Sequence, residues 1–213
     1  MTNLAALPGS LDTSLFLLIN GLLQHPLLDL LMPALSNKWY AFLLAAVLFP
    51  LLILRGGRRT WFLIFAGIAA ILLTDLGSAL LKDAIRRVRP CHVLAQVHLL
   101  GGCTRSFSMP SNHAGNMFAV AAVIWLGWRR WPLTLAGFLL AGGVAYSRVY
   151  LGVHYPGDVL AGAVWGGAVG WALLTGVGRC FPRQLGRATP PALPASPGPE
   201  DRPAAGETRT SEE

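Results

Sequence analysis

The sequence predicts an all-α, polytopic integral membrane protein. We expect a helical bundle of five transmembrane helices, preceded by an N-terminal helix that either lies in the membrane interface or forms a sixth span. Hydrophobic residues make up 54% of the 213 residues. Charged residues make up only 13%, about half the share typical of soluble domains. Several apolar runs are long enough to cross a bilayer. These observations exclude a disordered regulator and an ordinary cytosolic enzyme.

The first apolar run, at residues 13–35, is interrupted by polar residues and prolines: Asn20, Gln24, His25, Pro26, Asp29 and Pro33. An interfacial helix fits this mixed composition better than a spanning helix, and both interpretations stay open. The first basic residue is Lys38, so we expect no cleavable secretory signal. Residues 1–36 are therefore predicted to be an amphipathic or membrane segment, followed by a membrane-embedded core at 37–180.

Five cleaner apolar segments follow, at residues 39–54, 60–81, 113–128, 131–147 and 159–178. Tryptophans at their borders suit the headgroup region and extend the usable length of the shorter segments. In the last segment, Gly162, Gly166 and Gly170 recur at every fourth position, which permits close contact between membrane helices. A span that is merely rich in small residues explains the repeat equally well. Residues 181–213 lack apolar periodicity, so we expect a disordered cytoplasmic tail.

The net charge of +7 would suggest nucleic-acid binding in a soluble protein. Here the basic residues cluster between apolar runs, so membrane topology and an anionic substrate explain them better, and no nucleic-acid partner is expected. The positive-inside rule places the loops near 55–59, 128–131 and 179–187 in the cytoplasm. Residues 82–112 and 148–158 then face the periplasm or cell exterior. This assignment requires that several basic residues on that second face belong to a site.

Three short motifs lie on this second face. The first, at residues 82–90, is a lysine separated by six residues from Arg-Pro. The second is Pro-Ser-Asn-His at 110–113, directly before the third apolar segment. The third, at 147–158, is Ser-Arg, five residues, His, three residues and Asp. One border cation is usually a headgroup anchor, but three patterns on one face indicate a single site.

The residue types in these motifs suit the binding of a phosphate group. Lys82, Arg89 and Arg148 supply three fixed positive charges, and the guanidinium groups match phosphate oxygens bidentately. Backbone N–H groups around Ser111 and Asn112 lie at a predicted helix N-terminus, which favours anions. These cations supply the charge that Mg²⁺ provides elsewhere, so neither a metal nor a cofactor is expected.

Two histidines in the motifs can divide the work of phosphoryl transfer. His154 would attack phosphorus, and His113 would protonate the leaving oxygen. Asp158 follows His154 by four residues, so its carboxylate can reach back to an imidazole N–H and orient the ring. The prediction is a phosphatase that works through a phosphohistidine.

The three motifs resemble those of the type 2 phosphatidic-acid phosphatase superfamily, membrane lipid phosphatases related to vanadium haloperoxidases. The first and third motifs match completely, whereas Asn112 stands where the family usually has glycine. Asparagine tolerates positive φ better than most residues, and a phosphate-facing N–H survives the change. The resemblance covers about residues 60–178 and implies an extracytoplasmic site with His154 as nucleophile and Asp158 as its partner. It implies phosphate binding or acid catalysis by five residues: Lys82, Arg89, Ser111, His113 and Arg148.

The predicted function is therefore that of a multi-pass lipid phosphatase, most simply in a bacterial inner membrane. Undecaprenyl diphosphate is the first candidate substrate. Phosphatidylglycerol phosphate, phosphatidic acid and the phosphate of lipid A are the others. Residues 91–109 are expected to form an apolar lid that selects the lipid tail. A lipid phosphotransferase and a non-catalytic anion or lipid transporter remain as alternatives.

Other residues on the second face carry separate expectations. Asp75 is an acid inside a predicted span, seven residues before Lys82, and we favour it as an indirect partner of the cationic site over a structural capping role. Arg86, Arg87 and Arg105 lie outside the motifs and are predicted to anchor headgroups.

The three cysteines divide between the two faces. Cys91 and Cys103 lie in the loop between the first two motifs, where a disulfide and two free thiols are equally supported. Cys180 lies on the opposite side and is expected to stay reduced.

Overall fold

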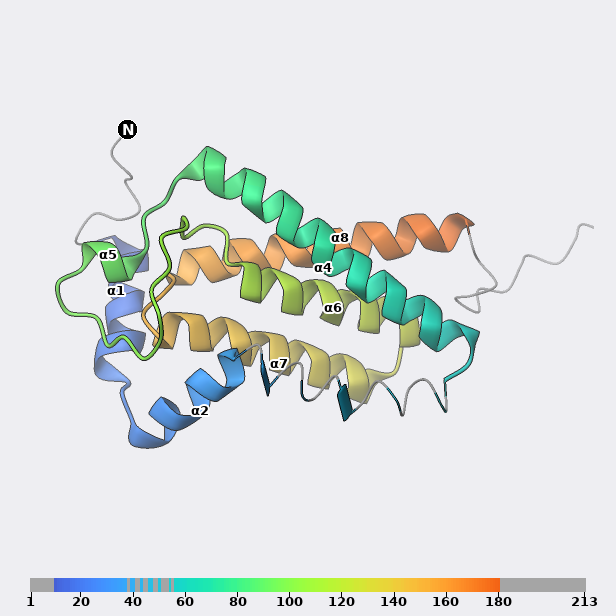
Figure 1. The fold of residues 1–213 in the computed structure, drawn as a ribbon, viewed down its shortest axis with the longest axis horizontal. Coiled ribbons are helices and arrows are strands. Elements are labelled where there is room, and N and C mark those ends of the chain that lie inside the picture. The colour runs from blue at the N-terminus through green and yellow to red at the C-terminus, as the bar shows by residue number, and fades with distance from the viewer. Residues whose placement is uncertain are drawn as a thin grey trace, which may run out of the picture.

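The computed structural model describes residues 10–37 and 56–180, together with isolated positions between 39 and 54. All regular elements in these parts are helices (Figure 1). Most of the expected span at 39–54, and all of the expected tail at 181–213, lie outside the described residues. The all-helical prediction is confirmed for the part of the chain that the structure describes.

Four long helices form the described bundle: α4 (Arg58–Ile85), α6 (Asn112–Trp128), α7 (Trp131–Tyr150) and α8 (Pro156–Cys180). Three of them, α4, α7 and α8, are long and apolar enough to cross a membrane. With 17 residues, α6 is at the lower limit for a span. The protein is a membrane helical bundle, and the expected count of five spans stays a prediction.

Alternating helix directions bring all three motifs to one end of the bundle (Figure 1). The end of α4, the start of α6, the end of α7 and the start of α8 meet there. Local sequence sets two of these boundaries. Arg86 takes the left-handed conformation with φ 52° and closes α4, and Pro156 opens α8, where its fixed φ suits a first helical turn. We call this the site end of the bundle.

The glycine repeat of α8 forms its contact with α6. A Cβ atom at Gly162, Gly166 or Gly170 would collide with the backbone of α6 or of its N-cap residue. The two helices therefore approach to backbone contact, and the close-contact interpretation of the repeat is confirmed. At the site end, the Ser111 N–H donates to the carbonyl of Asp158 at 3.0 Å, which joins the second motif to the third.

Residues 11–36 form a bent pair instead of one continuous helix. The first arm is α1 (Leu11–Leu17) with the π-helical turn η2 (Leu18–Leu22), and the second is α2 (Pro26–Ser36). The arms meet at 117°, because Pro26 cannot continue a helix and begins a new one. If the pair is counted as one broken span, the described residues contain up to four candidate spans.

Two of the polar residues that interrupt this N-terminal run, Asn20 and Asp29, bond to distant parts of the protein, whereas Gln24 and His25 are exposed. Asn20 Nδ2 donates to the carbonyls of His98, at 2.9 Å, and Tyr150, at 2.7 Å. Asp29 accepts from the Tyr150 hydroxyl at 2.6 Å. These bonds hold the bent pair across the site end, beside the loop that follows α4 (Figure 1).

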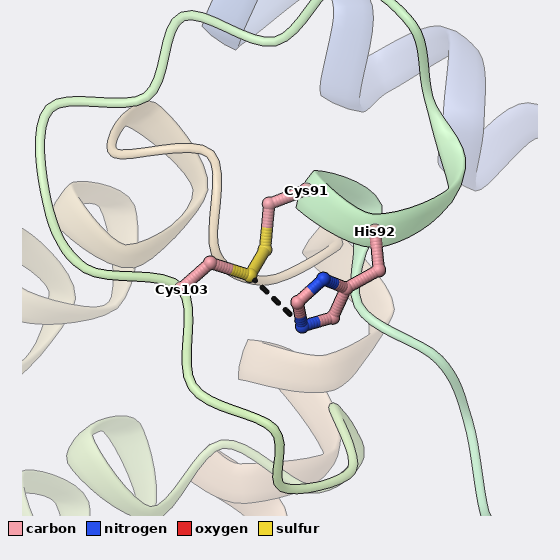
Figure 2. Close-up of side chains that lie close together, drawn as sticks. All are labelled: Cys91, His92 and Cys103. Carbon is pink, nitrogen blue, oxygen red and sulfur yellow. Dashed lines mark hydrogen bonds between the residues drawn. A yellow bond between two sulfur atoms is a disulfide. The ribbon is translucent and has the colours of Figure 1, made fainter.

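That loop contains the short helix α5 (Pro90–Val93) and is closed by a disulfide between Cys91 and Cys103 (Figure 2). His92 Nε2 lies 3.3 Å from the Cys103 sulfur. Since the two sulfurs are bonded to each other, this Cys-His cluster is not a ligand set for a metal. Cys180 is a free, exposed thiol at the opposite end.

Candidate active site

His154 lies in the short loop between α7 and α8 and is only 2% exposed. Its Nε2 is 3.0 Å from Arg89 Nη1. Its Nδ1 is 3.5 Å from Asp158 Oδ2 and 3.4 Å from Ser108 Oγ. A guanidinium group cannot accept a hydrogen bond, so Nε2 is the acceptor and Nδ1 carries the ring proton. The imidazole therefore presents a lone pair at Nε2, while its N–H faces a carboxylate.

Burial lowers the pKa of His154 from 6.5 to about 3. The charge of Arg89 acts in the same direction, and the hydrogen bond with Asp158 opposes it. The lowered pKa keeps the imidazole neutral at neutral pH, because charging it would place a cation in a desolvated pocket beside another cation. A neutral imidazole is the form that can act as a nucleophile.

Arg87 is a buried part of this site, so its predicted role as a headgroup anchor is wrong. It is 2% exposed, and its Nη1 donates to Asp158 Oδ1 at 2.7 Å. Its Nη2 pairs with Asp12 Oδ2 at 2.5 Å, and the guanidinium stacks 4.2 Å from the centre of the Tyr155 ring. The other oxygen of Asp12 accepts from the Gly157 N–H at 2.7 Å. Helix α1 thereby fixes the carboxylate that faces the histidine.

Sequence reasoning missed Arg87 and Asp12 because Arg87 occupies an unspecified position of the first motif and Asp12 lies outside all three motifs. Two weak sequence signals could have indicated them. Asp12 is an acid next to an apolar run, and Arg87 lies between Lys82 and Arg89, the two cations of the first motif. The neighbouring arginines differ because Arg86 sits in the left-handed turn that ends α4 and stays exposed. Arg105 is also exposed, so headgroup anchoring remains the prediction for these two.

Two of the predicted phosphate-binding cations clamp the loop that precedes α6. Lys82 Nζ donates to the carbonyls of Phe107, at 2.8 Å, and Pro110, at 2.7 Å. Arg89 Nε donates to the Ser106 carbonyl at 2.8 Å. Both cations therefore lie at the site, and a bound phosphate would have to replace some of these carbonyl acceptors.

Two other predicted phosphate ligands keep unused hydrogen-bonding capacity. Arg148 donates from Nη1 to the hydroxyl of Ser36, but its buried Nε has no partner among the described residues. Ser111 is fully buried, and its hydroxyl likewise has no partner in the described part of the chain. Buried donors without partners are costly, so these groups are suited to a ligand rich in acceptors.

His113, the second residue of α6, is exposed. It lies within electrostatic range of Arg148, Arg89 and Lys82. The same two arginines act on His154. The two imidazoles therefore border one cluster of positive charge, as a shared phosphoryl group requires.

Asp75 lies within α4 and pairs with two side-chain amides. Its Oδ1 accepts from Asn112 Nδ2 at 2.7 Å and from Asn116 Nδ2 at 3.1 Å. No described lysine or arginine forms an ion pair with it, and its role as an indirect partner of the cationic site stays a prediction. Asn112 is the first residue of α6 and is helical, so the substitution for glycine does not serve a positive φ.

Together these groups can perform in-line phosphoryl transfer. Nε2 of the neutral His154 ring accepts a hydrogen bond from Arg89, and the charges of Arg89 and Arg148 act on both His154 and His113. Backbone N–H groups at the start of α6 add a further anion-binding element. Preorganised positive charge of this kind stabilises the oxygens of a phosphoryl transition state.

Comparison with known proteins gives consistent matches. A family model described as the PAP2 superfamily matches residues 59–182. A lipid A 4'-phosphatase of Bacteroides thetaiotaomicron is 34% identical over 176 residues, which cover 76% of this chain and 75% of the relative. An undecaprenyl-diphosphatase of Sulfolobus acidocaldarius is 32% identical over 156 residues and 73% of each chain. The crystal structure of LpxE from Aquifex aeolicus matches with a TM-score of 0.66 and 30% identity, covering 78% of this chain and 96% of that one.

Proposed function

Because the chain belongs to the PAP2 superfamily and is a membrane lipid phosphatase, we propose that it cleaves the phosphate ester or diphosphate of a lipid through a phosphohistidine at His154. The observation that carries this proposal is the state of the imidazole. Arg89 donates to Nε2, which leaves Nδ1–H toward Asp158. Nε2 would become available for attack when a bound phosphate takes over the hydrogen bond from Arg89, and Asp158 would stabilise the charge that develops on the ring.

The proposed reaction has two steps. Nε2 of His154 forms a bond to phosphorus while the bond from phosphorus to the leaving oxygen breaks, and His113 donates its proton to that oxygen. A water molecule then attacks the phosphohistidine, gives its proton to His113 and displaces Nε2, so that inorganic phosphate leaves. Lys82, Arg89 and Arg148 stabilise the phosphoryl oxygens in both steps.

The test is phosphate release from a ³²P-labelled lipid phosphate by purified protein in detergent with EDTA present. We expect a phosphoenzyme that is labile to acid and stable to base. His154→Ala should lower the rate by about 10³-fold or more, as loss of a nucleophile does. His92→Ala, which changes an exposed histidine outside the proposed site, is the matched control. A requirement for added divalent metal would contradict the mechanism.

The two alternatives predict different results in the same assay. A transporter would keep its lipid flux in the His154→Ala variant, because no covalent step is involved. A phosphotransferase would release little free phosphate until an acceptor lipid is added.

We further propose that the site end faces the periplasm or cell exterior. Arg129, Arg130 and Arg179 are exposed at the opposite end, as expected for cytoplasmic loops. The disulfide between Cys91 and Cys103 is at the site end, and disulfides persist in oxidising compartments. A membrane-impermeant maleimide should therefore label the free thiol of Cys180 only after the cells are opened. Labelling in intact cells would reverse the orientation.

A further inference from the structure

A cavity of about 430 Å³ opens beside His113. Most of its wall is apolar and comes from four helices: Leu35, Ile71, Met117 and Val144. The polar part of the wall includes Ser36 and Asn37 and a hydrogen-bonded cluster formed by Asp75, Asn112 and Asn116. No described lysine or arginine lines the cavity. Ser36, which also lines the cavity, accepts a hydrogen bond from Arg148, so the cavity adjoins both the proposed general acid and the edge of the cationic cluster.

Hydrogen bonding fixes the orientation of the two amides. A carboxylate only accepts hydrogen bonds, so Asn112 and Asn116 must both turn their NH₂ groups toward Asp75. Their carbonyl oxygens then point away from it. Both oxygens are buried, and neither has a partner among the described residues. The cluster thus offers two amide oxygens and one carboxylate, all acceptors, and the amide oxygens lack donors.

A ligand that satisfies this cluster must supply hydrogen-bond donors and carry no negative charge at this point. Hydroxyl and amide N–H groups meet both conditions. A phosphate does not, because its oxygens are acceptors and its charge would be repelled by Asp75. Unpaired buried acceptors discriminate strongly against ligands that lack the matching donor.

On the premise of the phosphatase function proposed above, we infer that this cavity is the subsite for the leaving alcohol. It takes the hydroxyl-bearing headgroup of a sugar or polyol phosphate monoester in a lipid. The phosphoryl group then lies among the cations, the leaving oxygen lies at His113, and the headgroup donates to Asn112 and Asn116. A prenyl diphosphate, the first candidate from sequence alone, is the poorer substrate because its leaving group is itself a phosphate.

The departure from the family motif supports this assignment. Glycine at position 112 would provide no side-chain amide, so the cluster would lose one of its two oriented amide oxygens. Asn112 leaves the start of α6 helical, and its side chain is directed by Asp75. The substitution therefore changes what the cavity binds while it preserves the backbone that borders the proposed phosphate site.

The experiment compares two substrates with the purified full-length protein in detergent. One is a synthetic acylated glucosamine monophosphate, and the other is farnesyl diphosphate. Asn116→Leu and Asn112→Gly each remove one acceptor, and Gln24→Leu, which changes an amide outside the cavity, is the matched control. The measured quantity is kcat/KM for phosphate release, with a melting curve for each variant.

We expect wild type to prefer the sugar phosphate. Asn116→Leu and Asn112→Gly should each lower kcat/KM for that substrate by about tenfold, the effect of one lost hydrogen bond to the leaving group. For Asn116→Leu, kcat/KM for farnesyl diphosphate should change by less than about twofold, because that substrate makes no such bond. Asp75→Asn should raise turnover of farnesyl diphosphate, since the repelling charge is gone.

Equal losses for both substrates, or a wild-type preference for farnesyl diphosphate, would overturn the subsite. If Asn116→Leu has a lowered melting temperature, the ratio of kcat/KM for the two substrates in Asn112→Gly decides the question, because any effect on phosphate binding is common to both substrates. The failure of the underlying function looks different: wild type would then release phosphate from neither substrate. Release that depends on His154 but shows no preference would leave the phosphatase in place and remove only this subsite.

Discussion

The two ends of the helical bundle use arginine in opposite ways. At the site end, Arg87 is 2% exposed and Arg89 is 6% exposed, and each bonds to groups from distant parts of the chain. At the opposite end, Arg129 and Arg179 are exposed. Both sets lie where an apolar segment ends, so sequence position alone does not distinguish them. The comparison shows how to distinguish two kinds of arginine at the end of a membrane helix. A solvated arginine helps to set the membrane topology, whereas one surrounded by carbonyls and carboxylates belongs to a site.

The largest expected effect concerns the buried set. Arg87→Gln leaves Asp12 and Asp158 without their shared cation, so we expect a loss of about 3 to 5 kcal/mol in the free energy of unfolding, as for other broken buried ion pairs. Arg179→Gln at the opposite end should cost less than about 1 kcal/mol. Denaturation in mixed micelles measures both. Similar losses in the two variants would remove the distinction between the ends.

The cysteines allow the same comparison between the two ends of the bundle, with a somewhat smaller expected change in stability. Cys91→Ser opens the loop of the site end, whose disulfide joins residues separated by 12 positions. The entropy of closing such a loop is worth about 3 kcal/mol, so amide exchange in 91–103 should become much faster. Cys180→Ser should leave exchange unchanged, because that thiol is free and exposed. If the amides of residues 91–103 exchange no faster in the Cys91→Ser variant, packing alone holds the loop.

The glycines of α8 test whether close helix contact is needed throughout or only near the site. A methyl group at Gly166 would collide with the backbone of α6, whereas nothing lies within 4 Å of such a group at Gly176. Gly166→Ala should therefore lower stability by about 1 to 3 kcal/mol through overpacking. It should also lower kcat by displacing the first turn of α6, where the Gly115 N–H donates to the Ser111 carbonyl. Gly176→Ala should be neutral in both melting temperature and rate. A stable, active Gly166→Ala would mean that the helices can separate without cost.

The smallest expected effect is the change in folding stability for each pH unit, and it arises from His154 at the site end. Burial lowers the pKa of His154 from 6.5 to about 3, so the unfolded chain binds more protons than the folded one between these values. Stability should fall as pH decreases through this window, by at most about 1.4 kcal/mol per pH unit. Melting temperatures of wild type and His154→Gln should therefore converge in acid. Parallel curves would assign the acid sensitivity to other groups.

Much of the site follows from the sequence because its residues occur in short motifs whose spacing is local. The Lys-x6-Arg-Pro and Ser-Arg-x5-His-x3-Asp patterns place their residues near helix ends, and alternating helix directions then bring these ends together. Other features depend on contacts between distant segments. The pairing of Asp12 with Arg87 spans 75 positions, and no periodicity or local spacing predicts a contact of that kind.

The sequence by itself determined the helical membrane architecture, the three motifs and the types of residue that serve phosphoryl transfer, because hydrophobicity and local spacing are properties of the chain. Only the tertiary structure decided which of two adjacent arginines is buried, which imidazole nitrogen carries the proton and where the amide oxygens beside Asp75 point. Each of these depends on the partners that surround a side chain. Those partners come from segments that are distant along the chain and meet only when the bundle has formed.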